Sequence, residues 1–176
     1  VYAGRIAAYR ELETIAAASR LVDLPITLCG PADQTWLTSF DPGRATVLGA
    51  LPLDEAAALM SAAGLALVTH SDKWANHRLA LPNKLFHAVS LGLPVVATDI
   101  GELAKVVREH DLGTLYTPSD PEDLARAIRD VVAGFPRYVC NVETARPALC
   151  WDADAARLRA VYEKLAAAPA ADRGEG

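Results

Sequence analysis

The sequence predicts an α/β fold in which helices cover both faces of a parallel, doubly wound sheet of about six strands, with extra helices at the C-terminal end. Two observations support this prediction. Short apolar runs alternate with helical patterns along most of the chain, and the loops between them are short. The apolar runs also lack the polar–apolar alternation of half-exposed strands, as expected where helices cover both faces of a sheet.

Each predicted element follows from its local pattern. The apolar, strand-like runs are residues 1–4, 25–30, 45–51, 65–70, 94–99 and 113–118. Helical patterns fill the intervals at residues 10–22, 34–40, 54–63, 83–91, 102–110 and 121–133. The last of these begins with the segment SDPEDL, in which Ser119 or Asp120 serves as N-cap and Pro121 occupies the first helical position.

The C-terminal part of the chain contains no further strand pattern. Residues 136–168 predict two helices broken near Pro147, with Trp151 and Tyr162 packed on the body of the domain. We therefore expect one domain over residues 1–168 and a disordered tail over residues 169–176. The first residues, VYAG, already form a strand-like run, so an upstream domain is expected beyond this chain.

Composition limits the classes of partner. The 176 residues include 17 Lys and Arg against 22 Asp and Glu, and the resulting net charge of −5 disfavours a nucleic-acid partner. No apolar run reaches 18 residues, which predicts no transmembrane segment and leaves peripheral membrane association as the only membrane contact expected.

The three cysteines lack zinc-type spacing. Their odd number predicts reduced thiols and a cytoplasmic protein. Cys29 lies in an apolar run and is assigned to the core, and pairing of Cys140 with Cys150 is the alternative.

Ligands of doubly wound sheets bind beyond the carboxyl ends of the strands, which directs attention to the loops there. After the first strand, Gly4 permits a tight turn, and Arg5 and Arg10 are spaced to meet a phosphate group or to remain solvated surface residues. Gly30 predicts a second tight turn, and no G-x-G-x-x-G fingerprint is present. Asp54 is expected to cap the third helix.

The fourth strand is followed by an unusually long polar loop, residues 70–83. Long polar loops at this end of a sheet often carry function. His70, Asp72 and His77 match no metal-ligand spacing, so no metal is expected. Anion or sugar binding by the loop is the functional hypothesis, and a mobile surface loop is the alternative.

The helix that begins in LPNKLFHA has features of an anion site. Lys84 lies in the first turn, where a cation opposes the helix dipole unless an anion is shared there. Together with Asn83 and the free backbone amides of the first turn, Lys84 predicts a cradle for a diphosphate. His87 follows one turn later on the same face, either toward the ligand or as a surface residue.

The sequence as a whole resembles the donor-binding, C-terminal domain of retaining GT-B glycosyltransferases of family 4, the glycosyl transferases group 1. The segment LPNKLFHAVSLGLPVVATD is similar to the family pattern lPnKlfEymaaGlPVVatd, and GTLYTPSDPEDLARAI is similar to GllytpgDpeaLa.ai. GRIAAYR has the family's R-x4-K spacing, with Arg10 in place of the lysine. The similarity covers residues 1–166.

The resemblance implies a longer enzyme with two Rossmann-like domains, of which this chain is the half that binds a nucleoside-diphosphate sugar and requires no metal or cofactor. The partners implied are the nucleotide-sugar donor and the N-terminal, acceptor-side domain of the same enzyme, toward which the last helix returns. Arg5, Arg10, Asn83 and Lys84 then meet the donor diphosphate. This half alone is not expected to transfer sugar.

Two family positions depart from the pattern. The family's paired glutamates, which bind the donor sugar and ribose, correspond here to Leu79 and His87. A histidine can hydrogen-bond a hydroxyl but does not offer the paired acceptors of a carboxylate. The resemblance thus places His87 at the ribose, with Asn76, His77 and Arg78 left to take over the sugar contact.

Two alternatives stay open from sequence. One is a non-catalytic nucleotide-binding module of the same fold. The other is a receiver-like signalling domain, which would require acidic residues at the ends of the central strands, where Gly4, Arg5 and Leu51 stand instead. No catalytic residue is assigned, and the donor base, the sugar, the acceptor and the oligomeric state are not encoded in these motifs.

Overall fold

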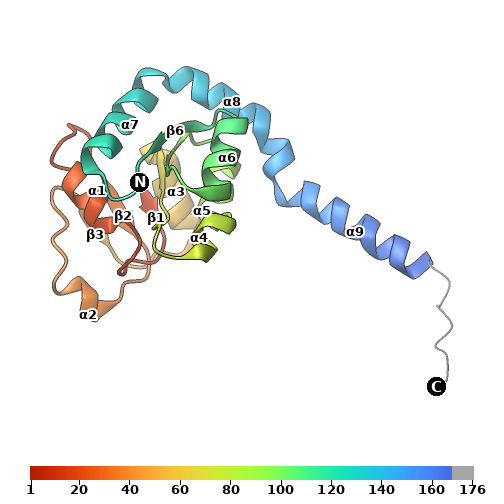
Figure 1. The fold of residues 1–176 in the computed structure, drawn as a ribbon, viewed down its shortest axis with the longest axis horizontal. Coiled ribbons are helices and arrows are strands. Elements are labelled where there is room, and N and C mark those ends of the chain that lie inside the picture. The colour runs from red at the N-terminus through yellow and green to blue at the C-terminus, as the bar shows by residue number, and fades with distance from the viewer. Residues whose placement is uncertain (168–176) are drawn as a thin grey trace.

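The computed structural model describes residues 1–167, so the expected tail at 169–176 lies outside the described residues. Two parallel three-stranded sheets form the centre of the molecule (Figure 1). The first contains β1 (Tyr2–Ala3), β2 (Thr27–Cys29) and β3 (Thr46–Leu48), in that order. The second contains β4 (Ala66–Val68), β5 (Val95–Thr98) and β6 (Gly113–Tyr116).

The two sheets meet at their first strands. The Leu67 amide donates to the Val1 carbonyl oxygen at 2.8 Å, and the Val1 nitrogen donates to the Leu65 carbonyl oxygen at 2.7 Å. These bonds extend the order to β3-β2-β1-β4-β5-β6, which is the order of a doubly wound fold whose ligands bind where the winding reverses. The predicted fold class is confirmed.

Helices cover both faces of this arrangement. They are α1 (Leu12–Ala18), α2 (Gln34–Leu37), α3 (Leu53–Ala63), α4 (Ala75–Leu79), α5 (Asn83–Ser90), α6 (Gly101–Glu109), α7 (Pro121–Ala133) and α8 (Phe135–Leu149). The last helix, α9 (Trp151–Ala167), follows them and covers neither face (Figure 1).

Alternate strand residues feed two separate cores. One core contains Tyr2, Leu28 and Leu67 together with buried residues of α1 and α7. The other contains Val68 and Val95 together with residues of α3, α5, α6 and α8. This division explains why the strands carry apolar residues on both of their faces, because each face packs against a helix layer.

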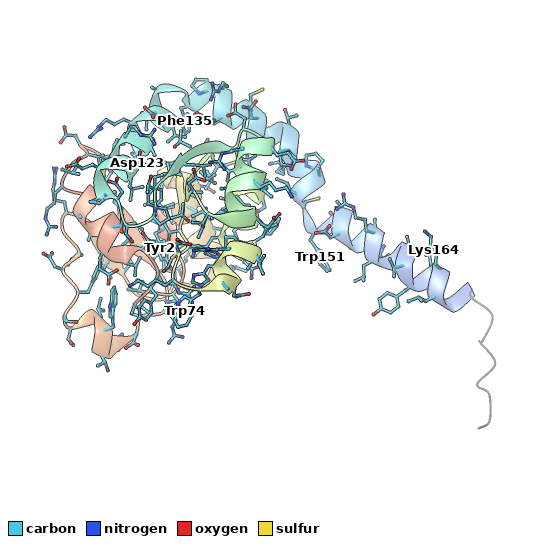
Figure 2. All side chains as sticks on the ribbon, in the orientation of Figure 1. Tyr2, Trp74, Asp123, Phe135, Trp151 and Lys164 are labelled. Atoms are coloured by element: carbon cyan, nitrogen blue, oxygen red, sulfur yellow. The ribbon has the colours of Figure 1, made fainter. Side chains whose placement is uncertain are left out.

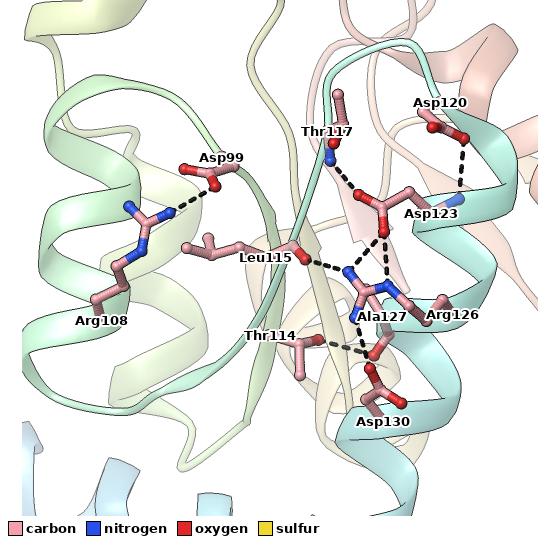
Figure 3. Close-up of polar contacts among 10 residues, drawn as sticks. All are labelled: Asp99, Arg108, Thr114, Leu115, Thr117, Asp120, Asp123, Arg126, Ala127 and Asp130. Carbon is pink, nitrogen blue, oxygen red and sulfur yellow. Dashed lines mark hydrogen bonds and ion pairs between the residues drawn. The ribbon is translucent and has the colours of Figure 1, made fainter.

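The second sheet is tied to α7 by polar contacts as well as by packing (Figure 3). The Thr114 hydroxyl donates to the Ala127 carbonyl oxygen at 2.7 Å, and the Thr117 amide donates to the Asp123 carboxylate at 2.7 Å. Asp120 accepts from the Asp123 amide at 2.9 Å as the helix N-cap. The predicted span and cap of α7 are therefore confirmed.

The C-terminal helices correct two expectations. The predicted break near Pro147 is wrong, because α8 includes Pro147 and ends at Leu149, and the extended backbone of Cys150 separates it from α9. The helix α9 then runs away from the body (Figure 1). Trp151 and Tyr162 are 71% and 66% exposed, so they do not pin this segment to the domain as predicted (Figure 2). All three cysteines are free thiols, Cys29 is buried, and the alternative Cys140–Cys150 pair is not formed.

Three local predictions are also wrong. The helix α1 begins at Leu12, two residues late, because Glu11 has a left-handed backbone with φ of 60°. Pro52 occupies the N-cap position of α3, so Asp54 lies in the first turn and caps nothing. The long loop after β4 folds in part into α4.

Among residues 1–167, no helix combines the length and apolar character needed to span a membrane.

A buried hydroxyl provides a test of the packing around β1 and β6. The Tyr116 side chain is fully buried, and its hydroxyl has no hydrogen-bond partner among the described residues. The Tyr2 hydroxyl, in contrast, donates to the Arg5 carbonyl oxygen at 2.9 Å. Because an unsatisfied buried polar group costs about 1–3 kcal/mol, Tyr116→Phe should raise the free energy of unfolding by about 1 kcal/mol.

Urea denaturation measures this change, and Tyr2→Phe is the matched control. It removes the same atom from a satisfied site and should lower stability by about 1 kcal/mol. Equal effects of the two substitutions would contradict the assignment.

Candidate functional site

A cleft of about 570 Å³ opens at the carboxyl ends of β1, β2 and β3. One wall is α5, which supplies Asn83, Lys84 and His87. The opposite wall is apolar and comes from the start of α3, including Leu53, while the turn after β1 contributes Arg5. The structure therefore brings four of the predicted site residues to one cleft.

A close approach of two glycines shapes the floor of this cleft. Gly30 has φ of 140°, and a Cβ atom there would stand 2.0 Å from the Gly4 carbonyl oxygen. A Cβ at Gly4 would itself lie 3.3 Å from the Lys84 Cδ atom. The turns after β1 and β2 can approach each other only because Gly30 lacks a side chain, and Lys84 lies close to Gly4. The expected tight turns at Gly4 and Gly30 have this role.

Lys84 is held in an unfavourable place for a cation. The side chain is half-buried, and its Nζ lies 4.9 Å from the centroid of the Tyr2 ring. Burial, followed by the charge of Arg10, lowers the pKa of Lys84 to about 8. None of the ion pairs between described residues includes Lys84, Arg5 or Arg10. The site thus collects positive charge that no carboxylate pairs directly.

His70 belongs to the same electrostatic cluster, at the carboxyl end of β4. Its Nδ1 lies 3.3 Å from the His77 carbonyl oxygen, which can only accept, so Nδ1 carries the proton. Burial lowers the pKa of His70 to about 4, the hydrogen bond to His77 opposes this shift, and the nearby Lys84, His77 and Arg10 add to it. His70 is therefore a neutral imidazole at pH 7.

The start of α5 faces the same cluster. Its N-cap position is Pro82, which has no side chain able to accept from the first-turn amides. An uncapped N-terminus presents free N–H groups and the positive end of the helix dipole. Lys84 adds a positive charge to this turn, and the three features together are favourable for an anion.

Hydrogen bonds to the Glu11 carboxylate hold the loop that carries Arg10 in place. The buried Glu11 carboxylate accepts from the Ser119 amide at 2.7 Å, from the Thr14 hydroxyl at 3.0 Å and from the Ser119 hydroxyl at 3.3 Å. Glu11 and Ser119 both have left-handed backbones, with φ of 60° and 62°. The Arg10 carbonyl oxygen also accepts from the Thr69 hydroxyl at 2.8 Å. These contacts bind the β1 loop to the β4 and β6 loops, and we name them the Glu11 clamp.

The predicted sugar-binding residues of α4 lie elsewhere. Asn76 is exposed, the His77 Nδ1 bonds the Ser71 carbonyl oxygen at 2.9 Å, and Arg78 pairs with Asp72 at 2.7 Å. None of the three α4 residues lines the cleft, in contrast to His87. Within residues 1–167, no group of three or more His, Cys, Asp or Glu side chains is placed to hold a metal ion.

Sequence reasoning did not identify two features of the site. The part played by His70 depends on its distance to Arg10 and Lys84, which no sequence pattern encodes. The Glu11 clamp joins residues 108 positions apart in the chain. In the sequence, Glu11 stands between Arg10 and Leu12 and is indistinguishable from an ordinary first-turn acid.

Comparison with known proteins decides the family. The sequence profile described as "Glycosyl transferases group 1" matches residues 1–133, more than half of the chain. The chain belongs to this family. A search of curated protein sequences gave no significant match.

Solved structures of glycosyltransferases have the same fold. Sucrose-phosphate synthase from Thermosynechococcus elongatus superposes with a TM-score of 0.75 at 24% identity, over 96% of this chain and 45% of that one. HepE from Anabaena, in complex with UDP-glucose, gives 0.65 at 18% identity, over 84% and 43%. WaaG, a glycosyltransferase of lipopolysaccharide biosynthesis, gives 0.58 at 18% identity, over 84% and 42%. This group 1 chain spans less than half the length of each.

The cost of holding Lys84 in the cleft is measurable. A pKa of about 8 in the folded state, below the ordinary 10.5, means that charged Lys84 opposes folding at every pH below about 8. The opposition fades as the pH rises from 8 to 10.5, because the unfolded chain then also loses the proton. Lys84→Met should therefore raise the free energy of unfolding at pH 7 by on the order of 2 kcal/mol.

Urea denaturation of parent and variant at pH 7 and pH 10 tests this expectation, since the gain should shrink at the higher pH. Lys105→Met, at an exposed lysine on α6, is the control and should change stability by no more than about 0.5 kcal/mol at either pH. A Lys84→Met variant that is no more stable than the parent at pH 7 would refute the proposed cost.

Proposed function

We propose that this chain is the donor-binding domain of a retaining glycosyltransferase that transfers a sugar from a nucleoside-diphosphate sugar to an acceptor. The observation that carries the proposal is the cluster of Arg10 and Lys84, which form no ion pair with the described residues, beside the uncapped start of α5. A cluster of this kind is stable only at a cost, and a bound diphosphate removes that cost. Family membership overturns the receiver alternative, and the HepE structure with UDP-glucose supports a nucleotide-sugar ligand for the fold.

The cleft suggests how a donor lies in it. The diphosphate meets Arg5, Arg10, Lys84 and the amides at Asn83. The nucleoside then follows α5 past His87, with its base against the apolar wall of α3. Asn76, His77 and Arg78 remain candidates for the transferred sugar, on the β4 side of the diphosphate.

In the proposed reaction, the bond between the anomeric carbon and the β-phosphate oxygen breaks, and the nucleoside diphosphate leaves with the electron pair. An acceptor hydroxyl oxygen forms the new bond to the anomeric carbon, and its proton passes to the departing diphosphate. Negative charge grows on the leaving oxygen. Fixed cations aimed at that oxygen stabilise the transition state more than the ground state. Arg5, Arg10 and Lys84 are the residues to which we assign this role.

The acceptor side of the reaction is proposed to come from a second domain. Two observations support a second domain. The chain spans less than half the length of the solved glycosyltransferases, and α9 has an exposed apolar face. Leu158, Tyr162 and Leu165 repeat at intervals of four and three and share one exposed face. Sucrose-phosphate synthase matches 96% of this chain and continues beyond it. We propose that α9 packs on the remaining half of the enzyme.

A non-catalytic nucleotide-binding module is the second candidate. It is favoured by the two departures from the family pattern, since Leu79 is 77% exposed on α4 and His87 stands where a carboxylate was expected. Sugar turnover by the full-length protein distinguishes the two candidates, because a binding module would hold the nucleotide without consuming the donor.

Calorimetric titration with uridine diphosphate tests the site. Losing a charge-assisted hydrogen bond costs about 1.5–3 kcal/mol, so Arg5→Ala and Arg10→Ala should each weaken binding by about ten- to a hundredfold. Arg44→Ala is the control, because Arg44 precedes the amino end of β3 and the cleft opens at the carboxyl ends of the strands. The affinity of this variant for uridine diphosphate should match that of the parent. Unchanged affinity in both test variants would refute the diphosphate assignment.

Proton uptake gives an independent test of Lys84. A diphosphate near Lys84 should raise its pKa from about 8, so binding at pH 8.5 should take up a fraction of a proton. Nucleotide phosphates are already fully ionised at that pH. Titrations in two buffers of different ionisation enthalpy measure the uptake.

Lys84→Arg separates charge from titration, because arginine keeps the positive charge but does not lose its proton. This variant should bind the nucleotide without proton uptake. Uptake equal to that of the parent would assign the proton to another group.

A further inference from the structure

A second cavity, of about 450 Å³, lies between α1 and the loops that follow β1, β4 and β6. It shares no lining residue with the cleft assigned to the nucleotide. Glu11 and Ser119, the two ends of the Glu11 clamp, both line it, so the hydrogen bonds that hold the Arg10 loop also fix the walls of this cavity. Its volume is that of a small-molecule site. We name it the Tyr9 pocket, after one of its lining residues.

Two aromatic rings meet at this pocket. Tyr9 lines it, and the centroid of the Trp74 ring lies 6.1 Å from that of the Tyr9 ring, at an interplanar angle of 89°. The two residues are 52% and 54% exposed, and neither belongs to the hydrophobic cores. Tyr9 also has a left-handed backbone with φ of 62°, which is unfavourable for a bulky residue and is retained mainly where function requires it. The rings therefore do not serve the packing of the domain.

The polar groups of the pocket include both donors and acceptors. None of the ion pairs between described residues includes Lys73 or Glu13, so the ammonium and the carboxylate are both available. The buried Ser71 hydroxyl oxygen accepts from the Lys73 amide at 3.1 Å, which leaves its proton for another acceptor. A ligand that both donates and accepts hydrogen bonds can use all three groups.

The charge of the Tyr9 pocket differs from that of the cleft. One lysine and two glutamates line the pocket, whereas Arg5 and Lys84 line the cleft together with no acidic residue. A phosphate or carboxylate ligand would therefore meet net negative charge in the pocket. A cationic ligand is disfavoured as well, because the Lys73 Nζ already lies 4.9 Å from the centroid of the Tyr9 ring. These charges select a neutral ligand.

A sugar ring has the properties that the pocket requires. The axial C–H bonds of a pyranose form an apolar face, which packs on an aromatic ring because the face of such a ring is electron-rich. The hydroxyls at the edge of the sugar each donate and accept hydrogen bonds. In β-linked glucose every hydroxyl is equatorial, so both faces of the ring are apolar.

We propose that the Tyr9 pocket binds one pyranose unit of a neutral saccharide. The sugar ring packs against Tyr9 and Trp74. Its hydroxyls bond the side chains of Ser71, Lys73 and Glu13. This site is additional to the cleft, and the proposal does not depend on whether the cleft binds a nucleotide.

Saturation-transfer NMR with cellotriose, a neutral trisaccharide of β-linked glucose, tests the proposal. Saturation of the protein should reach the ring C–H protons of the sugar, because these protons pack against the aromatic side chains. Sorbitol is the control ligand, since this open-chain polyol has hydroxyls but no ring face, and it should receive no saturation. Absence of transfer to cellotriose from the folded chain would overturn the proposal.

Substitutions of the two rings locate the site. Trp74→Ala and Tyr9→Asn should each weaken cellotriose binding by about tenfold in an NMR titration, and Trp74→Tyr should recover most of the affinity. Asparagine is chosen at position 9 because it tolerates the left-handed backbone. Trp151→Ala is the matched control, because Trp151 is 71% exposed at the start of α9, away from Trp74 in Figure 2. It should leave the affinity unchanged.

Circular dichroism and the urea midpoint establish that each variant is folded before affinities are compared. Equal losses in Trp74→Ala and Trp151→Ala, or unchanged affinity in both Trp74→Ala and Tyr9→Asn, would remove the saccharide from this pocket.

Competition with uridine diphosphate separates the two sites. Saturating uridine diphosphate should leave the affinity for cellotriose unchanged, because the Tyr9 pocket and the cleft have no lining residue in common. Displacement of cellotriose by the nucleotide would place the saccharide in the cleft and overturn the proposal. A chain that binds cellotriose but not uridine diphosphate would support the Tyr9 pocket while refuting the proposed function of the cleft.

Discussion

The contact between β1 and β4 is the constraint on which the rest of the molecule depends. Two backbone hydrogen bonds at Val1 join the sheets and place the first strand in the middle of six. The winding reverses at this point, so the helices that follow β1 and β4 diverge to opposite faces and leave a gap above the strand ends. The glycine contact deepens the gap on the β2 side, and α5 closes it on the other.

Electrostatics at this gap oppose the folded state. Burial of Lys84 beside Arg10, and of His70 beside both, lowers the pKa of Lys84 and the pKa of His70. The two hydrophobic cores supply the stability that offsets this opposition, because they bury apolar side chains on both faces of the sheets. The cationic cluster therefore lowers the stability of the domain, and under the proposed function a bound anion recovers what is lost.

Much of the fold was predictable because it depends on local pattern. The apolar runs, the proline and the aspartate at the start of α7, and the uncapped start of α5 are each visible within a few residues. The displaced start of α1 was not, because the left-handed Glu11 is stabilised by Ser119 far along the chain. The exposure of Trp151 was missed for a related reason, since an aromatic residue in a helical pattern predicts burial without naming the surface that buries it.

The same difference between local pattern and long-range contact decided which site residues were predicted correctly. Arg5, Asn83, Lys84 and His87 follow strand ends or a helix start, and the sheet topology alone brings them to one edge. Asn76, His77 and Arg78 were selected for their polarity in a supposed loop. None of the three lines the cleft, because the loop folds in part into α4, where His77 and Arg78 find partners within the loop.

The Glu11 clamp has a consequence for the thermodynamics of ligand capture. A loop that is free before binding loses conformational entropy when a ligand orders it, at a cost of about 1–2 kcal/mol for each residue fixed. The backbone of the Arg10 loop is ordered when the domain folds, through a carboxylate buried away from the cleft. Binding of an anion would then restrict only side-chain rotamers, so the backbone of the loop is preorganised for the ligand and does not have to close over it.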